Sequence, residues 1–290
     1  MKANLYALGA IALWATLAAL GVSLSHVPPF LLTGLSLLIG SVIALPLLRH
    51  DLSQWRVPIS TLALGVYGLF GFHFLLFIAL RHAPPVEANL VNYLWPLFMV
   101  VLAPLLLPDI QLRSAHVAAA LLGFAGAAMA ILGASSGEPG GASEVSGAIA
   151  AGGWSWGYLL ALASGLIWAS YSLLTKRVKP FPTAAIGLFG LLSGLLSLLC
   201  HWLLEPAIQL SGNDWMLIVL MGLGPLGAAF FLWDRALKLG DARHIGILSY
   251  LTPLTSTMML LAVTHRPLTW PIALATVMIV GAAVWGLRSR

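Results

Sequence analysis

The sequence predicts an all-helical integral membrane protein built from two related halves, and three observations support this fold class. Of the 290 residues, 60% are hydrophobic and 8% are charged, with a mean hydropathy of +0.97, whereas soluble domains carry about 25% charged residues. Apolar runs of roughly 20 residues, the length that a helix needs to cross a bilayer, recur from end to end. Finally, a motif of the first half returns in the second half.

Ten membrane spans are predicted from the apolar runs. They cover approximately residues 4–24, 30–48, 58–80, 84–106, 113–134, 155–175, 181–203, 214–238, 242–263 and 269–287. Such long runs exclude a barrel of alternating strands, because every backbone polar group in lipid needs a partner within the chain. The first run is expected to be retained rather than cleaved as a signal peptide, since its Trp14-Ala15 pair recurs as Trp168-Ala169.

The basic residues predict the orientation of these spans. With the N-terminus in the cytoplasm, twelve basic residues lie inside and only Arg81 and Arg266 lie outside, which is the bias expected for cytoplasmic loops. Both termini are therefore predicted to be cytoplasmic. The net charge of +5 follows from this topology and requires no nucleic-acid partner.

The repeated motif divides the chain into two five-span halves. Tyr93, Leu94, Pro96 and Leu97 return as Tyr250, Leu251, Pro253 and Leu254, each displaced by 157 positions. Because five spans is an odd number, the second half enters the membrane from the opposite side, so the halves are predicted to be inverted copies. We expect a first repeat over 1–134, an external linker rich in Gly, Ser and Ala over 135–153, and a second repeat over 154–290.

Two prolines and two glycines at matching places carry structural predictions. Pro96 and Pro253 lie near the centres of spans four and nine, where a proline removes one backbone hydrogen bond and bends or interrupts the helix. Broken helices at corresponding places in two halves point to the binding site of a transporter, so both prolines are hinge candidates. The pairs Gly126-Ala127 and Gly281-Ala282, in spans five and ten, consist of small residues suited to close helix contact.

Several polar and aromatic side chains within the spans are candidates for a central substrate cavity. His73 is the ionisable group in the middle of a span, and such groups are usually functional; the alternative is a neutral ring that satisfies a buried hydrogen bond. Deeply placed tryptophans need a partner for the indole N–H in a wet cavity or in the protein. Asparagines in lipid line a cavity or join helices. The complete candidate set is Trp14, His73, Asn89, Asn92, Tyr93, Trp95, Trp168, Tyr171, Ser249 and Tyr250.

Missing residue types also limit the function. The single cysteine, Cys200, excludes a disulfide framework and a cysteine metal cluster, and we expect neither a metal nor a cofactor. Mid-span Asp, Glu, Lys and Arg are absent from the predicted cavity face, which favours a zwitterionic or neutral substrate over a phosphate.

The repeated motifs resemble a known family. The run SYLTPL over 249–254 and its echo NYLWPL over 92–97, each preceded by an Ala-Leu pair, resemble the drug/metabolite transporter superfamily and specifically its EamA branch. The Trp-Ala near the start and the histidine in span three resemble the bacterial aromatic amino acid exporters of that branch. The resemblance implies that Trp14, His73, Tyr93, Trp95 and Trp168 contribute to the cavity, and that amino acids leave through the bacterial inner membrane by alternating access.

Other functions remain open at this point. An exporter of drugs or other amphipathic metabolites shares the same fold features. An intramembrane enzyme would need a nucleophile and base or a metal cluster at one depth, and a channel would differ only in its flux. The expected partners are amino acid substrates and the lipid bilayer, with a monomer as the expected state and a dimer as the alternative.

Overall fold

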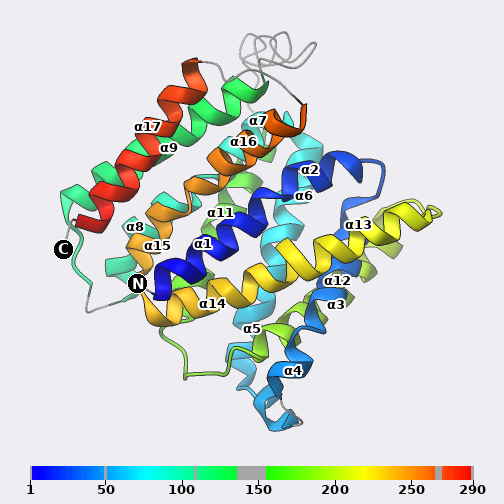
Figure 1. Ribbon diagram of the computed structural model, residues 1–290. Coiled ribbons are helices and arrows are strands. Elements are labelled where there is room, and N and C mark those ends of the chain that lie inside the picture. The colour runs from blue at the N-terminus through cyan, green and yellow to red at the C-terminus, as the bar shows by residue number, and fades with distance from the viewer. Residues whose placement is uncertain (1, 49–50, 108–109, 136–154, 265–269, 289–290) are drawn as a thin grey trace. The chain divides into compact units, whose positions relative to one another are not determined.

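The computed structural model describes residues 2–48, 51–107, 110–135, 155–264 and 270–288 (Figure 1). Every regular element in these residues is helical, which confirms the predicted all-helical class. In chain order the elements are α1 (Lys2–Ala15), α2 (Leu17–Ser23), α3 (Pro29–Ser41), α4 (Ala44–Leu48), η1 (Leu52–Trp55), α5 (Ile59–Val66), η2 (Tyr67–Gly71), α6 (Phe72–His82), α7 (Pro85–Asn92), α8 (Trp95–Leu106), α9 (Ser114–Ser135), α11 (Gly157–Leu174), α12 (Ala185–Leu204), α13 (Gly212–Leu223), η3 (Gly224–Ala228), α14 (Ala229–Leu239), α15 (Ala242–Leu248), α16 (Leu251–Thr264) and α17 (Trp270–Arg288). Apart from Ser135, the predicted linker over 135–153 lies outside the described residues.

Eight segments of the described residues are long and apolar enough to cross a membrane. They are Lys2–Ser23, Pro29–Leu48, Ile59–His82, Pro85–Leu106, Ser114–Leu132, Gly157–Leu174, Ala185–Leu204 and Gly212–Leu239, and they match the first eight predicted spans. Helices α15 and α16 occupy the predicted ninth span, and α17 occupies the tenth with a shorter apolar stretch over Trp270–Gly286. The total of ten spans stays a prediction.

The helices form two compact units. Unit 1 contains residues 1–74 and 171–240, and unit 2 contains residues 75–170 and 241–290. The boundaries fall inside α6 and α11, so both helices contribute residues to each unit. Each unit takes segments from both predicted repeats. The two compact units therefore do not coincide with the two predicted sequence repeats, and the repeat boundaries stay a prediction.

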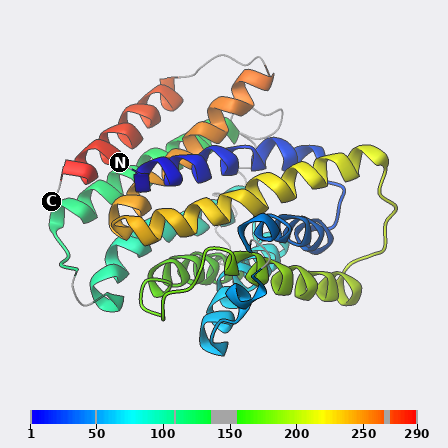
Figure 2. The same ribbon diagram turned by 60° about the horizontal axis from the view of Figure 1, so that its bottom comes forward.

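Unit 1 is held together by closely packed helix pairs. Helix α1 runs beside α14, as the blue and yellow ribbons show in both views (Figure 2), and α3 packs on α12. The α3–α12 contact is close because glycines face each other: a Cβ added to Gly34 would lie 3.1 Å from the carbonyl oxygen of Gly194, and one added to Gly194 would lie 2.9 Å from that of Gly34. Small residues allow the backbones to approach to this distance, which strengthens van der Waals packing between membrane helices.

The start of α3 is capped by a residue remote in sequence. The Glu205 carboxylate follows α12, and its two oxygens accept hydrogen bonds from the backbone N–H groups of Phe30 (3.0 Å) and Leu31 (3.1 Å). His201 Nδ1 lies 3.0 Å from the same carboxylate, whose side chain is fully buried. A negative charge at a helix N-terminus satisfies otherwise unpaired N–H groups and complements the helix dipole. Glu205 thereby joins α12 to α3.

Unit 2 contains a long pair of antiparallel helices, α9 and α17. They are drawn in green and red and lie side by side in both views (Figures 1 and 2). A Cβ added to Gly126 of α9 would lie 3.1 Å from the carbonyl oxygen of Ala275 in α17, so the close contact predicted at this glycine is confirmed. In the second pair of small residues the prediction holds for Ala282, which is fully buried in one core cluster with Ala127 of α9, and fails for Gly281. Gly281 is exposed and has no neighbour within 4 Å of an added Cβ, because it lies on the face of α17 that points away from α9.

Candidate functional site

Both predicted helix interruptions are present. Helix α7 ends at Asn92 before α8 begins at Trp95, and α15 ends at Leu248 before α16 begins at Leu251. The turns are tight, because backbone hydrogen bonds reach back only three residues in the chain. Leu94 N donates to Val91 O and Tyr250 N donates to Ile247 O, each at 3.2 Å. Pro96 and Pro253 follow as the second and third residues of the new helices, where a missing N–H has no helical partner to lose.

The two interrupted helices meet within unit 2. Helix α15 packs on α8, where a Cβ added to Gly246 would lie 3.3 Å from the carbonyl oxygen of Pro96 and 3.1 Å from Cβ of Met99. Because Gly246 has no side chain, α15 lies directly against Pro96 of α8. The two breaks come from different predicted repeats, yet one unit contains both.

Two π-helical segments form a second irregularity, which the sequence reasoning missed. They cover Tyr67–Gly71 (η2) and Gly224–Ala228 (η3), and each residue number in η3 is 157 higher than its counterpart in η2. Single π turns inside α-helices are rare and frequently occur at functional sites. Each segment contains two glycines, and this is the signal in the sequence that could have pointed to them.

One ring nitrogen bonds to a carbonyl oxygen of each π-helical segment. Trp14 Nε1 donates to Pro225 O in η3 at 3.1 Å, and His73 Nδ1 lies 2.6 Å from Leu69 O in η2. A carbonyl only accepts, so Nδ1 of His73 carries a proton. Both side chains are buried, with 8% of Trp14 and 7% of His73 exposed.

These two residues belong to an aromatic cluster in unit 1, which we define as Trp14, His73, Phe230 and Trp233. The Phe230 ring makes edge contacts with Trp14 (centroids 6.2 Å apart) and with His73 (6.3 Å), and Trp233 lies 5.2 Å from Trp14. Phe230 is the repeat partner of His73 by the displacement of 157, so the repeat could have identified it. The sequence reasoning missed Trp233, whose indole donates to Ser172 Oγ at 3.1 Å.

Tyr171, another candidate residue, is a buried residue of unit 1. Its ring lies against Gly68 of η2, where an added Cβ would overlap it. Tyr171 is therefore packed on the same π-helical segment whose Leu69 carbonyl binds His73.

Unit 2 brings together three further candidates. The rings of Trp95 and Trp168 meet edge to face with centroids 6.4 Å apart, and both are buried. Asn92 Nδ2 donates to Ser164 Oγ at 3.0 Å, which joins the end of α7 to α11. Helix α11 approaches this break closely because a Cβ added to Gly165 would lie 2.8 Å from Asn92 O. Asn92 thus makes the interhelical hydrogen bond that was the alternative to a cavity role.

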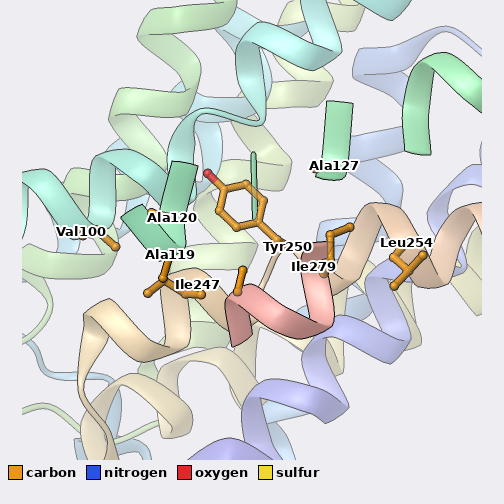
Figure 3. Close-up of a cluster of buried hydrophobic side chains, with 9 residues drawn as sticks. Val100, Ala119, Ala120, Ala127, Ile247, Tyr250, Leu254 and Ile279 are labelled. Atoms are coloured by element: carbon orange, nitrogen blue, oxygen red, sulfur yellow. The ribbon is translucent and has the colours of Figure 1, made fainter. Parts of the chain in front are cut away.

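The other candidates of unit 2 have different surroundings. Asn89 is exposed and Tyr93 is half-buried, whereas Ser249 is buried with its hydroxyl donating to Gly246 O at 2.5 Å. Tyr250 is fully buried in a core cluster with alanines of α9 and Ile247 and Ile279 (Figure 3). Its ring covers Gly123. Tyr250 therefore has a packing role here, and its predicted contact with substrate stays a prediction.

Metal binding finds no support among the residues that the structure describes, since no group of three or more His, Cys, Asp or Glu side chains is placed to hold an ion. The chemistry available in the two units is therefore aromatic surface, hydrogen-bonding groups and backbone carbonyls at the helix irregularities. Such groups bind and orient a small molecule.

Comparison with known proteins identifies the family. The model of the EamA-like transporter family matches residues 1–132 and 155–287. The chain belongs to the EamA-like transporter family. The unmatched stretch between these ranges corresponds closely to the predicted linker, and the resemblance noted from the motifs over 92–97 and 249–254 is confirmed.

Individual EamA-like relatives match over nearly their whole length. The chain is 43% identical to the aromatic amino acid exporter YddG of Ancylobacter novellus, with 100% of this chain and 98% of the relative covered. It is 28% identical to the aromatic amino acid exporter YddG of Salmonella typhimurium, with the same coverage. The chain is also similar to a solved crystal structure, with 39% sequence identity and a TM-score of 0.88. The match covers 100% of this chain and 99% of the chain in that structure.

Proposed function

We propose that this EamA-like protein exports amino acids, aromatic and other neutral ones, across the bacterial inner membrane. The single observation that carries the proposal is the 43% identity, over the full length of the chain, to a protein named as an aromatic amino acid exporter. Apolar helices make the chain a multi-pass membrane protein. A cytoplasmic location of both termini is part of the proposal and is based on the distribution of basic residues.

The aromatic cluster of unit 1 is the part of the structure that best fits this substrate class. Aromatic rings stabilise one another through edge contacts worth about 0.5–1.5 kcal/mol beyond the burial of area. The ring of Phe230 already makes two such contacts, and an aromatic substrate side chain would exchange with or extend them. His73 holds its ring at this cluster through the bond to Leu69 O and would offer that ring to the substrate side chain.

The interruptions in α7–α8 and α15–α16 support movement during transport. Broken helices expose backbone groups that bind polar parts of a substrate, and a turn between two short helices changes its backbone angles more easily than a continuous helix does. We propose Pro96 and Pro253 as hinges because each follows such a turn. Alternating access then arises from changes at both hinges, with the cycle starting from the cytoplasmic side.

The test is reconstitution of the purified protein in liposomes with a panel of labelled amino acids, with and without an imposed pH gradient. We expect saturable flux of phenylalanine, tyrosine and tryptophan that unlabelled neutral amino acids inhibit. Flux that rises only with a pH gradient would assign proton antiport, whereas equal flux without one would assign passive uniport. Absence of amino acid flux in vesicles that retain folded protein would refute the proposal.

Three other functions give distinct results in the same vesicles. A drug or metabolite exporter would transport labelled cationic drugs, which would then compete with any amino acid flux. A channel would give flux that does not saturate with substrate concentration. An intramembrane enzyme would convert its substrate in detergent without vectorial movement; the names of the relatives, all exporters or transporters, favour transport.

A further inference from the structure

Unit 1 contains a pocket that shares no residue with the candidate functional site. Its volume is about 430 Å³, within the range of roughly 300–1,000 Å³ typical of small-molecule sites. The pocket lies where α4, η1, the start of α12 and α14 come together, at the ends predicted to be cytoplasmic. Its lining residues are Pro46, Leu47, Gln54, Thr183, Ala184 and Arg235.

Hydrogen bonds fix the polar wall of this pocket. Trp55 Nε1 donates to Ala184 O at 2.9 Å, which attaches η1 to the start of α12. Gln54 Nε2 donates to Leu48 O at 3.2 Å, which folds η1 back onto α4. Both bonds connect the lining to helix ends, so Gln54 and the backbone at Ala184 have fixed positions in the pocket wall.

The charge in this region is positive. Thr183 Oγ1 and Lys238 Nζ contact the same oxygen of the buried Asp234 carboxylate, at 2.7 and 2.6 Å, so Lys238 compensates that negative charge. Arg235 is exposed and forms no ion pair with a carboxylate of the described residues. Its guanidinium lies 5.7 Å from the centre of the Tyr6 ring, and Nη1 donates to Tyr6 Oη at 3.4 Å. The ring therefore orients the guanidinium. Arg235 also interacts electrostatically with Asp234, and because Lys238 and Arg235 are two cations beside one carboxylate, one positive charge is left in excess.

We propose that this pocket binds one anionic group, a carboxylate or a phosphate, on Arg235. The guanidinium offers paired N–H donors whose geometry fits both groups, and such charge-assisted bonds are stronger than neutral ones. Pro46 and Leu47 form an apolar wall, which suits a ligand whose remaining part is hydrophobic. Two sources supply this chemistry on the cytoplasmic side, namely a free amphipathic carboxylate and the headgroup phosphate of an anionic lipid.

The test measures equilibrium binding and is independent of transport, so it separates this inference from the proposed function. The full chain in a non-ionic detergent is titrated with short-chain phosphatidylglycerol or with 3-phenylpropionate, and the melting temperature Tm is followed. Short-chain phosphatidylcholine and the neutral amide 3-phenylpropanamide are the matched probes. We expect one anionic probe to raise Tm while its matched probe does not; the arm that responds identifies the lipid or the free carboxylate as the source.

Variants assign the binding to the pocket. Arg235→Gln is expected to weaken the apparent affinity for the responding probe by about 10- to 100-fold, the usual worth of a hydrogen-bonded charged partner. Arg177→Gln removes the same charge from an exposed position of unit 1 outside the pocket and is expected to bind as the unaltered protein does. Arg235→Lys keeps the charge without the paired donors, so intermediate binding is expected; it replaces Arg235→Gln if that variant fails to fold.

Three results would overturn the inference. The first is that neither anionic probe raises Tm. The second is that Arg235→Gln, or its substitute Arg235→Lys, binds the probe as tightly as the unaltered chain does. The third is that Arg177→Gln weakens binding as much as the Arg235 variant does. The last result would mean that the general positive charge of the surface, and not the pocket, attracts the probe.

Discussion

His73 combines two roles that different substitutions separate. It is the second residue of α6, directly after η2, and its Nδ1 proton binds the Leu69 carbonyl while its ring contacts Phe230. The hydrogen bond was the structural alternative considered for this histidine, and the aromatic contact is the part suited to a substrate. Because the carbonyl needs only a donor and the cluster needs only a ring, Gln and Phe each preserve one of these contacts.

We expect His73→Gln to impair transport more than stability. Glutamine retains an N–H donor for Leu69, whereas losing the ring removes an aromatic contact and is expected to reduce flux by up to about tenfold. His73→Phe keeps the ring and leaves the carbonyl without this donor, so a loss of about 1 kcal/mol in stability is expected. Liposome flux over a range of pH and Tm in detergent measure both effects. Flux equal to that of the unaltered protein at every pH for both variants would exclude His73 from transport.

Gly68 illustrates how a missing side chain shapes unit 1. An added Cβ would overlap the Tyr171 ring, so Gly68→Ala is expected to destabilise the protein by about 1–3 kcal/mol through overpacking. Gly21→Ala is the matched control, because Gly21 is also helical and has no neighbour within 4 Å of an added Cβ. Thermal unfolding in detergent compares the two variants. Equal Tm values would contradict the packing seen at Gly68.

At the scale of single elements, the interruptions were predictable and their partners were not. Proline at the centre of an apolar run predicted both breaks, and the structure places them at residues 93–94 and 249–250. Periodicity within one helix cannot reveal what another helix presents to it. Tyr93 and Tyr250 occupy matching positions, but Tyr250 is buried because Gly123 of α9 leaves space for its ring, whereas Tyr93 is half-buried.

Replacing either hinge proline by alanine is expected to change gating. Alanine at position 96 or 253 supplies the missing N–H and removes the clash with the preceding turn, so the two short helices are free to join into one. We expect reduced efflux and altered access of a thiol reagent to cysteines placed at the break, measured from both sides in a Cys200→Ser background. Pro104→Ala is the control, since Pro104 lies inside α8 away from the turn. Unaltered efflux and access in both hinge variants would defeat the assignment.

The remote cap of α3 gives a prediction for stability. Glu205→Ala removes the acceptor of two backbone N–H groups and the partner of His201, so we expect a loss of about 2–3 kcal/mol. Glu205→Gln keeps one acceptor oxygen and is expected to lose less. Asp51→Ala is the control because Asp51 caps only the exposed η1 through Ser53 N. A Tm for Glu205→Ala no lower than that for Asp51→Ala would show that the cap does not hold α3.

At the scale of the whole molecule, composition and repetition predicted the membrane class, the eight described helical segments that are long and apolar enough to cross a membrane, and the family. They did not predict the two compact units, because each unit combines segments that are distant in sequence, such as 1–74 with 171–240. Nor did they predict the aromatic cluster as a set. Its members come from α1, α6 and α14, and hydropathy treats each helix separately.

Orientation in the membrane is the remaining prediction at this scale. The excess of basic residues in predicted cytoplasmic loops leads us to expect both termini inside. A single cysteine placed at either end, in a Cys200→Ser background, should react with an impermeant thiol reagent only in inverted vesicles. Labelling of the two ends from opposite sides would contradict an even number of spans and with it the inverted halves.

The matched π-helical segments also bear on the history of the chain. A π turn contains one residue more than the α turn it replaces, so a single inserted residue is enough to produce one. Two independent insertions at the same register in both halves would be a coincidence, whereas one insertion in a single ancestral half, copied when that half was duplicated, accounts for both η2 and η3. On the proposed duplication, we infer that the distortion is older than the doubling of the chain, and descendants of the undoubled ancestor are expected to carry it too.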